Sequence, residues 1–176
     1  MNTDFVNIEY LKIGNDRQRL AYNTLTKNEI LAKLHQFDPI FVGTIPINID
    51  IESSDLDIIC YYKDKNNFTK KLKNKFGNTK DFNIYEQYGQ EQNAIVANFK
   101  IDGFEIEIFG QNIPTRKQNA YRHMIIENKI LNERGESFRQ KIIELKRKGH
   151  KTEPAFAIIL ELKGNAYTEL LAYETK

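Results

Sequence analysis

Apolar positions recur along this chain with two different spacings. Apolar residues three or four positions apart indicate helix faces, as at Ile30, Leu34 and Phe37, whereas continuous or alternating apolar runs indicate strands. Helical spacing dominates the beginning and the last third of the chain, and strand-like runs dominate between them. The pattern predicts helices at 16–36 (in two parts), 67–76, 116–133, 136–148, 153–163 and 165–174, and strands at 40–42, 56–62, 82–88, 94–101 and 104–109.

Local signals mark several boundaries between these elements. Thr26 and Glu29 have the spacing of a capping box, which predicts that the first helical region is divided in two. Gly77 follows the third predicted helix, where glycine favours a left-handed cap. Asp102 and Gly103 separate two alternating runs, which predicts a hairpin turn with positive φ at both residues.

The order of these elements predicts an α+β fold. We expect a mixed or mostly antiparallel sheet with flanking helices and a C-terminal helical region. Residues 1–115 are expected to form the α/β core with its N-terminal helices, and residues 116–176 a helical region packed on that core as a single compact unit. A chain of 176 residues is long enough to bury such a core.

Composition narrows the class of protein without defining its activity. The chain has 26 basic and 24 acidic residues, so a net charge of +2 makes no case for a nucleic-acid or membrane surface. Cys60 is the single cysteine, which favours a reducing compartment. No run reaches the roughly 18–20 apolar residues of a membrane helix, and the N-terminus lacks the pattern of a signal peptide. We therefore expect a cytoplasmic protein with no membrane partner.

The candidate chemistry centres on two carboxylates at the start of the second predicted strand. Asp55 and Asp57 would project from the same face of that strand, with Leu56 pointing into the core. Two carboxylates so close repel each other unless a cation lies between them, and oxygen ligands suit Mg²⁺ or Mn²⁺. The alternative is a polar strand start with no further role.

A glycine and two hydroxyl residues accompany this acid pair. Gly43 and Thr44 end the preceding strand, and Asp55 follows Gly43 by twelve positions. Glycine lets a phosphate approach the backbone closely, and a neighbouring hydroxyl can bind a phosphate oxygen. Ser54, directly before Asp55, is a further candidate for nucleotide binding.

A third carboxylate is expected from the last predicted strand. Glu105 and Glu107 would share one face of that strand, opposite Phe104 and Ile106. Glu107 is the preferred catalytic and metal ligand, and Glu105 is the second choice. The alternative is an exposed strand face on which charges deter aggregation.

Arg122 and His123, on the helix after the sheet, are weaker candidates for contacting a phosphate or a base. The competing interpretation, which we favour, is a surface arginine and a partly buried histidine held by a hydrogen bond.

Gly43–Thr44, the acid–apolar–acid strand and the later acidic strand together resemble the DNA polymerase β-like nucleotidyltransferase superfamily over about residues 41–110. The resemblance implies that Gly43 and Thr44 hold nucleotide phosphate, that Asp55 and Asp57 bind Mg²⁺, and that Glu107 is the third acid. The whole chain also resembles a small uncharacterised bacterial family with this core. That resemblance is carried by the runs at 43–47, 107–111, 118–124 and 151–157.

Three functional hypotheses follow. The first is a metal-dependent nucleotidyltransferase that moves a nucleoside monophosphate from a nucleoside triphosphate to a hydroxyl on a small molecule, a protein or an RNA. The second is an inactive member of the fold that binds a nucleotide or acts as an antitoxin-like module toward a protein partner or a second copy. The loop at 45–51 contains no basic residue, which favours the second hypothesis. Metal-dependent hydrolysis at the same carboxylates is a third, weaker hypothesis.

Overall fold

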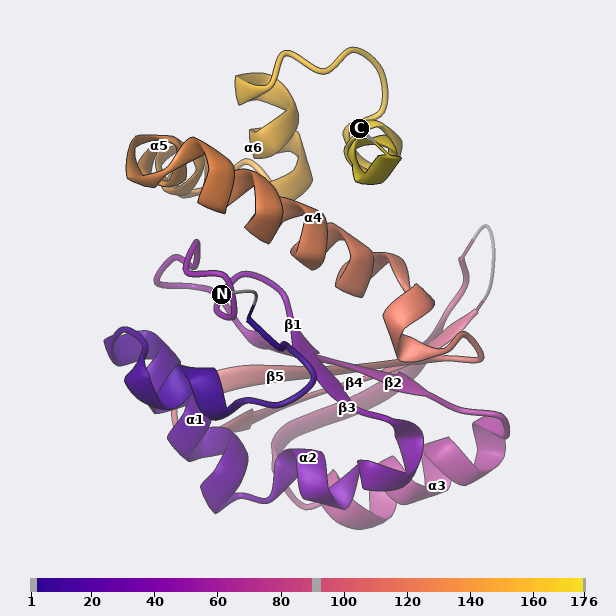
Figure 1. Ribbon diagram of the computed structural model, residues 1–176. Helices are drawn as coiled ribbons and strands as arrows, with labels where there is room; N and C mark the ends of the chain where they lie inside the picture. The colour runs from indigo at the N-terminus through magenta and orange to yellow at the C-terminus, as the bar shows by residue number, and fades with distance from the viewer. Residues whose placement is uncertain (1–2, 90–92, 176) are drawn as a thin grey trace.

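The protein consists of a mixed sheet with helices on both faces (Figure 1). The structure is a computed structural model that describes residues 3–89 and 93–175. The strands are β1 (Ile40–Val42), β2 (Leu56–Tyr61), β3 (Lys80–Gln87), β4 (Ala94–Ile101) and β5 (Phe104–Gln111). The helices are α1 (Asp16–Lys27), α2 (Ile30–Lys33), α3 (Lys65–Phe76), α4 (Asn119–Arg134), α5 (Glu136–Arg147), α6 (Thr152–Ile159) and α7 (Ala166–Leu171). Short 3₁₀ helices occur at Glu9–Ile13, His35–Phe37, Thr115–Lys117 and Ala172–Thr175. The predicted α+β class is confirmed.

The sheet has the strand order β1-β2-β5-β4-β3. Strands β2 and β5 are parallel neighbours, and the other neighbouring pairs are antiparallel. The β4–β5 hairpin turns at Asp102 and Gly103, whose φ values of 49° and 85° confirm the predicted positive φ at both positions. A sheet of this kind is mixed, and the parallel pair lies in its interior.

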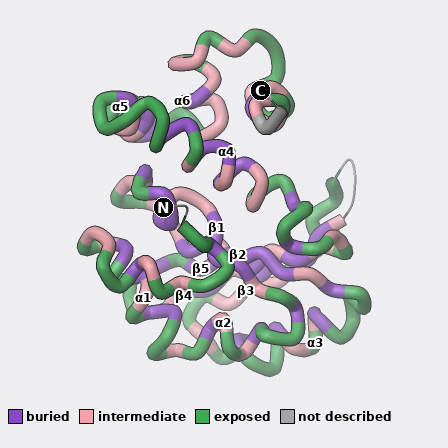
Figure 2. Tube along the Cα trace, in the orientation of Figure 1, coloured by how far each residue is buried: buried purple, intermediate pink, exposed green. Residues whose placement is uncertain are grey.

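The two faces of the sheet are covered by different parts of the chain. Helices α1, α2 and α3 lie against one face, and α4 crosses the other, with α5, α6 and α7 beyond it (Figure 1). Side chains alternate along β2, so that Leu56, Ile58 and Cys60 join the first apolar cluster while Ile59 joins the second. The buried residues are concentrated in the strands and on the parts of the helices that face the sheet (Figure 2). Asp57 therefore faces the side of the sheet that α4 covers.

The capping box predicted at Thr26 and Glu29 does not form. Helix α1 does end at Lys27, but Thr26 turns its hydroxyl back to the carbonyl oxygen of Tyr22 at 2.7 Å, and Glu29 has a left-handed φ of 53°. A side chain bonded to its own helix cannot also cap the next one. The capping box of this region is instead formed by Asn15 and Gln18 at the start of α1.

Other boundaries differ from prediction because local hydrogen bonds start or stop a helix. Gly77 has right-handed angles (φ −58°, ψ −22°) where a left-handed cap was predicted, because its N–H still bonds to the carbonyl of Lys73. Helix α3 starts at Lys65, because the Asp64 carboxylate accepts bonds from the backbone of the first turn. Helix α6 ends at Ile159, ahead of the left-handed Glu161 (φ 56°).

The predicted division between residues 1–115 and 116–176 falls within the 3₁₀ helix Thr115–Lys117 and remains a prediction. Within residues 3–89 and 93–175, no helix combines the length and apolar character needed to span a bilayer.

Candidate functional site

Three carboxylates meet on the sheet face that α4 covers. Asp57 of β2 and Glu107 of β5 are direct partners in the parallel register, and Asp55 lies two residues before Asp57. Neighbouring strands lie about 4.8 Å apart, so the two strand carboxylates project side by side. The predicted cluster of Asp55, Asp57 and Glu107 is therefore brought together by the pairing of two strands remote in sequence.

The electrostatics of this cluster favour a bound cation. Burial, followed by the charges of Asp55 and Glu107, raises the pKa of Asp57 well above its ordinary value, and Lys146 offsets this in part. Burial and the Asp55 charge also raise the pKa of Glu107, against a hydrogen bond from Asn98. Carboxylates that destabilise one another in this way fit Mg²⁺ or Mn²⁺, since a divalent ion cancels their repulsion and takes oxygen ligands.

Gly43 makes room for the Asp57 carboxylate. It follows β1, whose last residue Val42 is the register partner of Asp57, and it has a φ of +86°. A β-carbon at position 43 would overlap Oδ2 of Asp57. Glycine is required here both for its backbone conformation and for the approach of the carboxylate.

The hydroxyl groups of Thr44 and Ser54 bond to each other. Thr44 Oγ1 donates to Ser54 Oγ at 3.3 Å, and Ser54 Oγ also accepts the backbone N–H of Ile51 at 3.0 Å. The carbonyl of Thr44 accepts the N–H of Ile49 at 3.1 Å. These bonds close the loop between β1 and β2 and fix the Thr44 hydroxyl against Ser54, the residue before Asp55.

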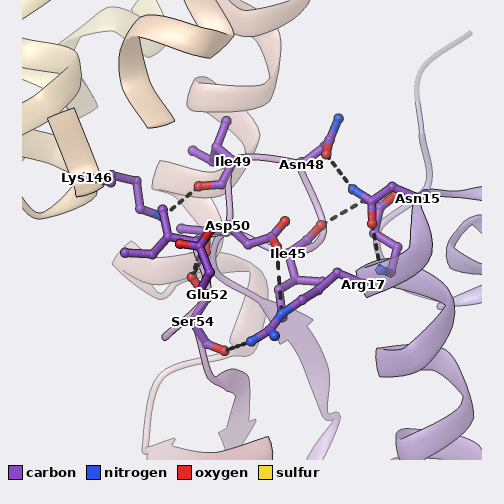
Figure 3. Close-up of polar contacts among 12 residues, drawn as sticks. Asn15, Arg17, Ile45, Asn48, Ile49, Asp50, Glu52, Ser54 and Lys146 are labelled. Carbon is purple, nitrogen blue, oxygen red and sulfur yellow. Dashed lines mark hydrogen bonds and ion pairs between the residues drawn. The ribbon is translucent and has the colours of Figure 1, made fainter. Parts of the chain in front are cut away.

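Basic side chains from other elements hold the backbone of this loop (Figure 3). Arg17 of α1 donates to the carbonyl of Ser54 at 2.6 Å, and Lys146 of α5 donates to the carbonyl of Ile49 at 2.8 Å. Arg139 of α5 donates to the carbonyl of Asn48 at 3.1 Å. The loop thus lacks basic residues of its own but is bound by cations from both sides.

A cavity of about 580 Å³ lies between the acidic sheet face and the C-terminal helices. Its volume falls within the range of about 300–1,000 Å³ usual for small-ligand sites. Of the predicted site residues, Gly43, Thr44, Asp57, Glu107 and His123 line it, whereas Asp55, Ser54, Glu105 and Arg122 lie outside its wall. Further wall residues include Gln87, Phe109, Gln111, Lys117, Asn119, Met124, Glu127, Thr152, Glu153 and Tyr167.

The two glutamates of β5 have different surroundings. The Glu105 side chain is 72% exposed and pairs with Lys100 at 3.3 Å. Glu107 is partly buried and faces Asp57. The exposed-face interpretation therefore describes Glu105, and the acid-cluster interpretation describes Glu107.

His123 lies on the cavity wall opposite the sheet carboxylates. It is 4% exposed, and burial, together with the nearby Arg122 charge, lowers its pKa to about 4. Its Nδ1 has no hydrogen-bond partner among the described residues. The hydrogen bond that we expected to hold a partly buried histidine is thus not formed at this nitrogen.

The sequence did not predict that Arg17, Arg139 and Lys146 bind the β1–β2 loop or that Glu127 lines the cavity. Glu127 does carry a signal, because it follows His123 by four positions and so lies on the same buried face of α4. Lys146 also carries a signal in the sequence, because it follows the buried Ile142 by four positions and so lies on the same apolar face of α5.

Several solved structures share this arrangement of strands and helices. The polymerase core of TRAMP, an RNA surveillance complex, matches with a TM-score of 0.53 and 12% identity over 93% of this chain and 50% of its own. The Cid1 poly(U) polymerase with MgGTP bound gives 0.52 and 10% identity, over 75% and 42% of the two chains. The GLD-2/RNP-8 complex gives 0.51 and 12% identity, over 82% and 56%. The protein has a nucleotidyltransferase-like fold.

At such low identities these similarities define the fold alone, and the chain spans only 42% to 56% of the length of these three structures. The sequence matches the family described as Domain of unknown function (DUF4269) over residues 23–173. The chain belongs to this family. A comparison with curated proteins gives no match.

Proposed function

We propose that the protein is a metal-dependent nucleotidyltransferase that moves a nucleoside monophosphate from a nucleoside triphosphate to an acceptor hydroxyl. The observation that carries this proposal is the direct register of Asp57 with Glu107, beside Asp55 and against Gly43. The nucleotidyltransferase-like fold supports it, and two structures of the Cid1 poly(U) polymerase have MgGTP and Mg 3'-dATP bound.

The carboxylates of Asp55, Asp57 and Glu107 would hold Mg²⁺ or Mn²⁺. When bound, the metal would neutralise charge on the phosphates and align the attacking and leaving oxygens. Gly43 allows a phosphate to approach the backbone, and the Thr44 hydroxyl can turn from Ser54 to donate to a phosphate oxygen. Ser54 would act by holding Thr44.

In the transfer itself, the acceptor oxygen would attack the α-phosphorus and pyrophosphate would leave. The acceptor proton needs a base within the cavity. Glu107 is the candidate for that role where it does not hold the metal, because it lines the cavity beside Asp57. The base and sugar of the nucleotide would occupy the cavity beyond the carboxylates, toward His123.

The proposal is tested by Mg²⁺-dependent binding and transfer. Calorimetry with each of the four triphosphates should show binding that requires Mg²⁺ and is lost in the Asp55→Asn/Asp57→Asn variant. Triphosphates labelled at the α-phosphate should then transfer label to a small-molecule extract, to protein or to RNA, which identifies the acceptor class. Label released only as nucleoside monophosphate would indicate hydrolysis.

A second candidate is a nucleotide-binding or protein-interaction module without catalysis. The observation that favours it is the shortage of cations for a triphosphate. Arg17, Arg139 and Lys146 are committed to loop carbonyls, and Lys117 is the single lysine or arginine on the described cavity wall. Binding of a nucleotide with no transfer to any acceptor class, or binding of a protein partner alone, would favour this candidate.

A further inference from the structure

A second group of ligand-type side chains lies on the helical wall of the cavity. His123 and Glu127 are one turn apart on α4, and Glu153 lies in the first turn of α6. One nitrogen and two carboxylate oxygens from these residues lie within 4.8 Å of one another. His123 Nδ1 and Glu153 Oε1 are 3.7 Å apart. The group thus brings together three different metal-ligating side chains from two helices.

Two atoms of this group are buried without a hydrogen bond. Nδ1 of His123 and Oε1 of Glu127 have no partner among the described residues, and each of these residues is only 4% exposed. Burying a polar atom without a hydrogen bond destabilises the folded state, and more so when the atom is charged. Both residues line the cavity, so a small side-chain rotation would let a ligand in the cavity satisfy these atoms.

Lys146 does not neutralise the negative charge of Glu127 and Glu153. Its Nζ donates to the carbonyl of Ile49 at 2.8 Å. Its single charge also acts on four carboxylates at once, those of Asp50, Asp57, Glu127 and Glu153. A further cation near Glu127 and Glu153 would therefore stabilise the folded protein.

We propose that His123, Glu127 and Glu153 form a binding site for a divalent transition metal such as Zn²⁺. A mixed set of imidazole nitrogen and carboxylate oxygens suits Zn²⁺, Co²⁺ or Mn²⁺, whereas Mg²⁺ and Ca²⁺ take oxygen ligands. Zinc bonds of about 2.0–2.2 Å place two ligand atoms of one tetrahedral ion roughly 3.3 Å apart, so small side-chain rotations would complete the site.

This site would differ from the sheet carboxylates in position and in chemistry. Three protein ligands leave one position of a tetrahedral ion free, and that position would face the cavity and could bind water or a ligand oxygen. The inference goes beyond the proposed nucleotidyl transfer and holds whether or not the sheet carboxylates support catalysis.

The test uses Co²⁺ as a coloured stand-in for Zn²⁺, on the full chain freed of metal by chelation and dialysis. The titration is run on the Asp55→Asn/Asp57→Asn/Glu107→Gln variant, which lacks the sheet carboxylates. We expect one equivalent of Co²⁺ to bind with visible absorption typical of nitrogen ligation, and Zn²⁺ to displace it. The substitutions His123→Gln and Glu153→Gln, made separately in this variant, should each weaken binding by at least about tenfold, a loss typical even of groups that only support a ligand.

Matched controls are His35→Gln and His150→Gln, which alter exposed histidines and should leave the titration unchanged. Circular dichroism establishes that each variant is folded. If the triple variant does not fold, the same titration is made on the natural sequence with excess Mg²⁺ occupying oxygen-only sites. Absence of stoichiometric Co²⁺ binding, or binding that survives both His123→Gln and Glu153→Gln, would overturn the proposal and leave a protonated Glu127 as the explanation of the cluster.

Discussion

The Asp57 carboxylate occupies the space that a β-carbon on residue 43 would need. Gly43 directly follows β1, whose last residue Val42 pairs with Asp57 of the antiparallel β2, and the positive φ of Gly43 (+86°) turns its backbone past the carboxylate. Glycine is thus required at this position for the acid cluster to keep its geometry, in addition to any contact with phosphate.

Replacing Gly43 should separate this packing role from the cost of backbone strain. Gly103 has nearly the same φ (+85°) but no atom near its missing β-carbon, so Gly103→Ala is a matched control. Both substitutions should cost roughly 1–2 kcal/mol for a left-handed alanine. We expect Gly43→Ala to cost about 1–3 kcal/mol more through overpacking and to abolish Mg²⁺-dependent nucleotide binding. Thermal unfolding and calorimetry measure the two effects, and equal losses in both variants would contradict the packing role.

The third acid can be assigned with a pair of substitutions on one strand. Glu107→Gln removes the carboxylate that faces Asp57, while Glu105→Gln removes the exposed one two positions away. If Glu107 accepts the acceptor proton, its loss should lower the transfer rate by about 10²–10⁴-fold. Glu105→Gln should leave the rate within about twofold, since it removes only an exposed ion pair worth about 0–1 kcal/mol. The reverse order of effects would assign the role to Glu105.

The carboxylate cluster should lower stability as the pH rises. Asp57 and Glu107 have folded-state pKa values above their ordinary 3.8 and 4.5, so the folded protein holds their protons more tightly than the unfolded chain. Their contribution to the free energy of unfolding is therefore favourable at low pH and is lost as the pH rises through the raised pKa.

Asp57→Asn should accordingly raise Tm at pH 7.5, by about 2–4 °C if the relieved repulsion is about 1 kcal/mol. The gain should shrink toward pH 4, and Mg²⁺ should raise Tm of the natural protein but not of the variant. A gain independent of pH would show that charge repulsion is not its cause.

Lys146 should stabilise the β1–β2 loop through its bond to Ile49. Lys146→Met keeps the apolar part of the side chain but leaves a buried carbonyl without its donor, which should cost about 1–3 kcal/mol. Lys141→Met, on the same helix but exposed, should change stability by no more than about 0.5 kcal/mol. Denaturant unfolding measures both, and hydrogen exchange at Ile49 and its neighbours should report local loosening in the first variant only.

Much of the fold could be predicted because it follows from local patterns. Alternation in the strands, helical spacing after residue 116 and the Asp102–Gly103 turn are properties of neighbouring residues, and they placed each strand to within two residues at either end. Helix capping was less predictable. The Thr26 hydroxyl could either cap the next helix or bond to the carbonyl of Tyr22 in its own helix, and the sequence does not show which bond forms. Gly77 likewise kept a helical bond to Lys73 that composition alone does not reveal.

The site was predicted only as far as its residues share one strand. Asp55 and Asp57 can be placed on a common face by alternation, but the choice between Glu105 and Glu107 depends on the register between β2 and β5. Residues on the helical wall of the cavity can likewise be grouped from the sequence only where they share one helix. The spacing of His123 and Glu127 is visible in the sequence, but the approach of Glu153 depends on how α6 packs against α4 and α5.

The parallel pairing of β2 with β5 also bears on how the protein folds. Asp57 and Glu107 are 50 positions apart, and β5 lies between β2 and β4 in the finished sheet. Closing so long a loop costs entropy before its contacts form. We therefore expect β2 and β5 to pair slowly and late in folding. A nascent or partly unfolded chain that retains the β4–β5 hairpin would hold Glu107 without Asp57. The acid cluster should therefore form only when β2 has paired with β5, and a metal ion that bound to the cluster would report that step of folding.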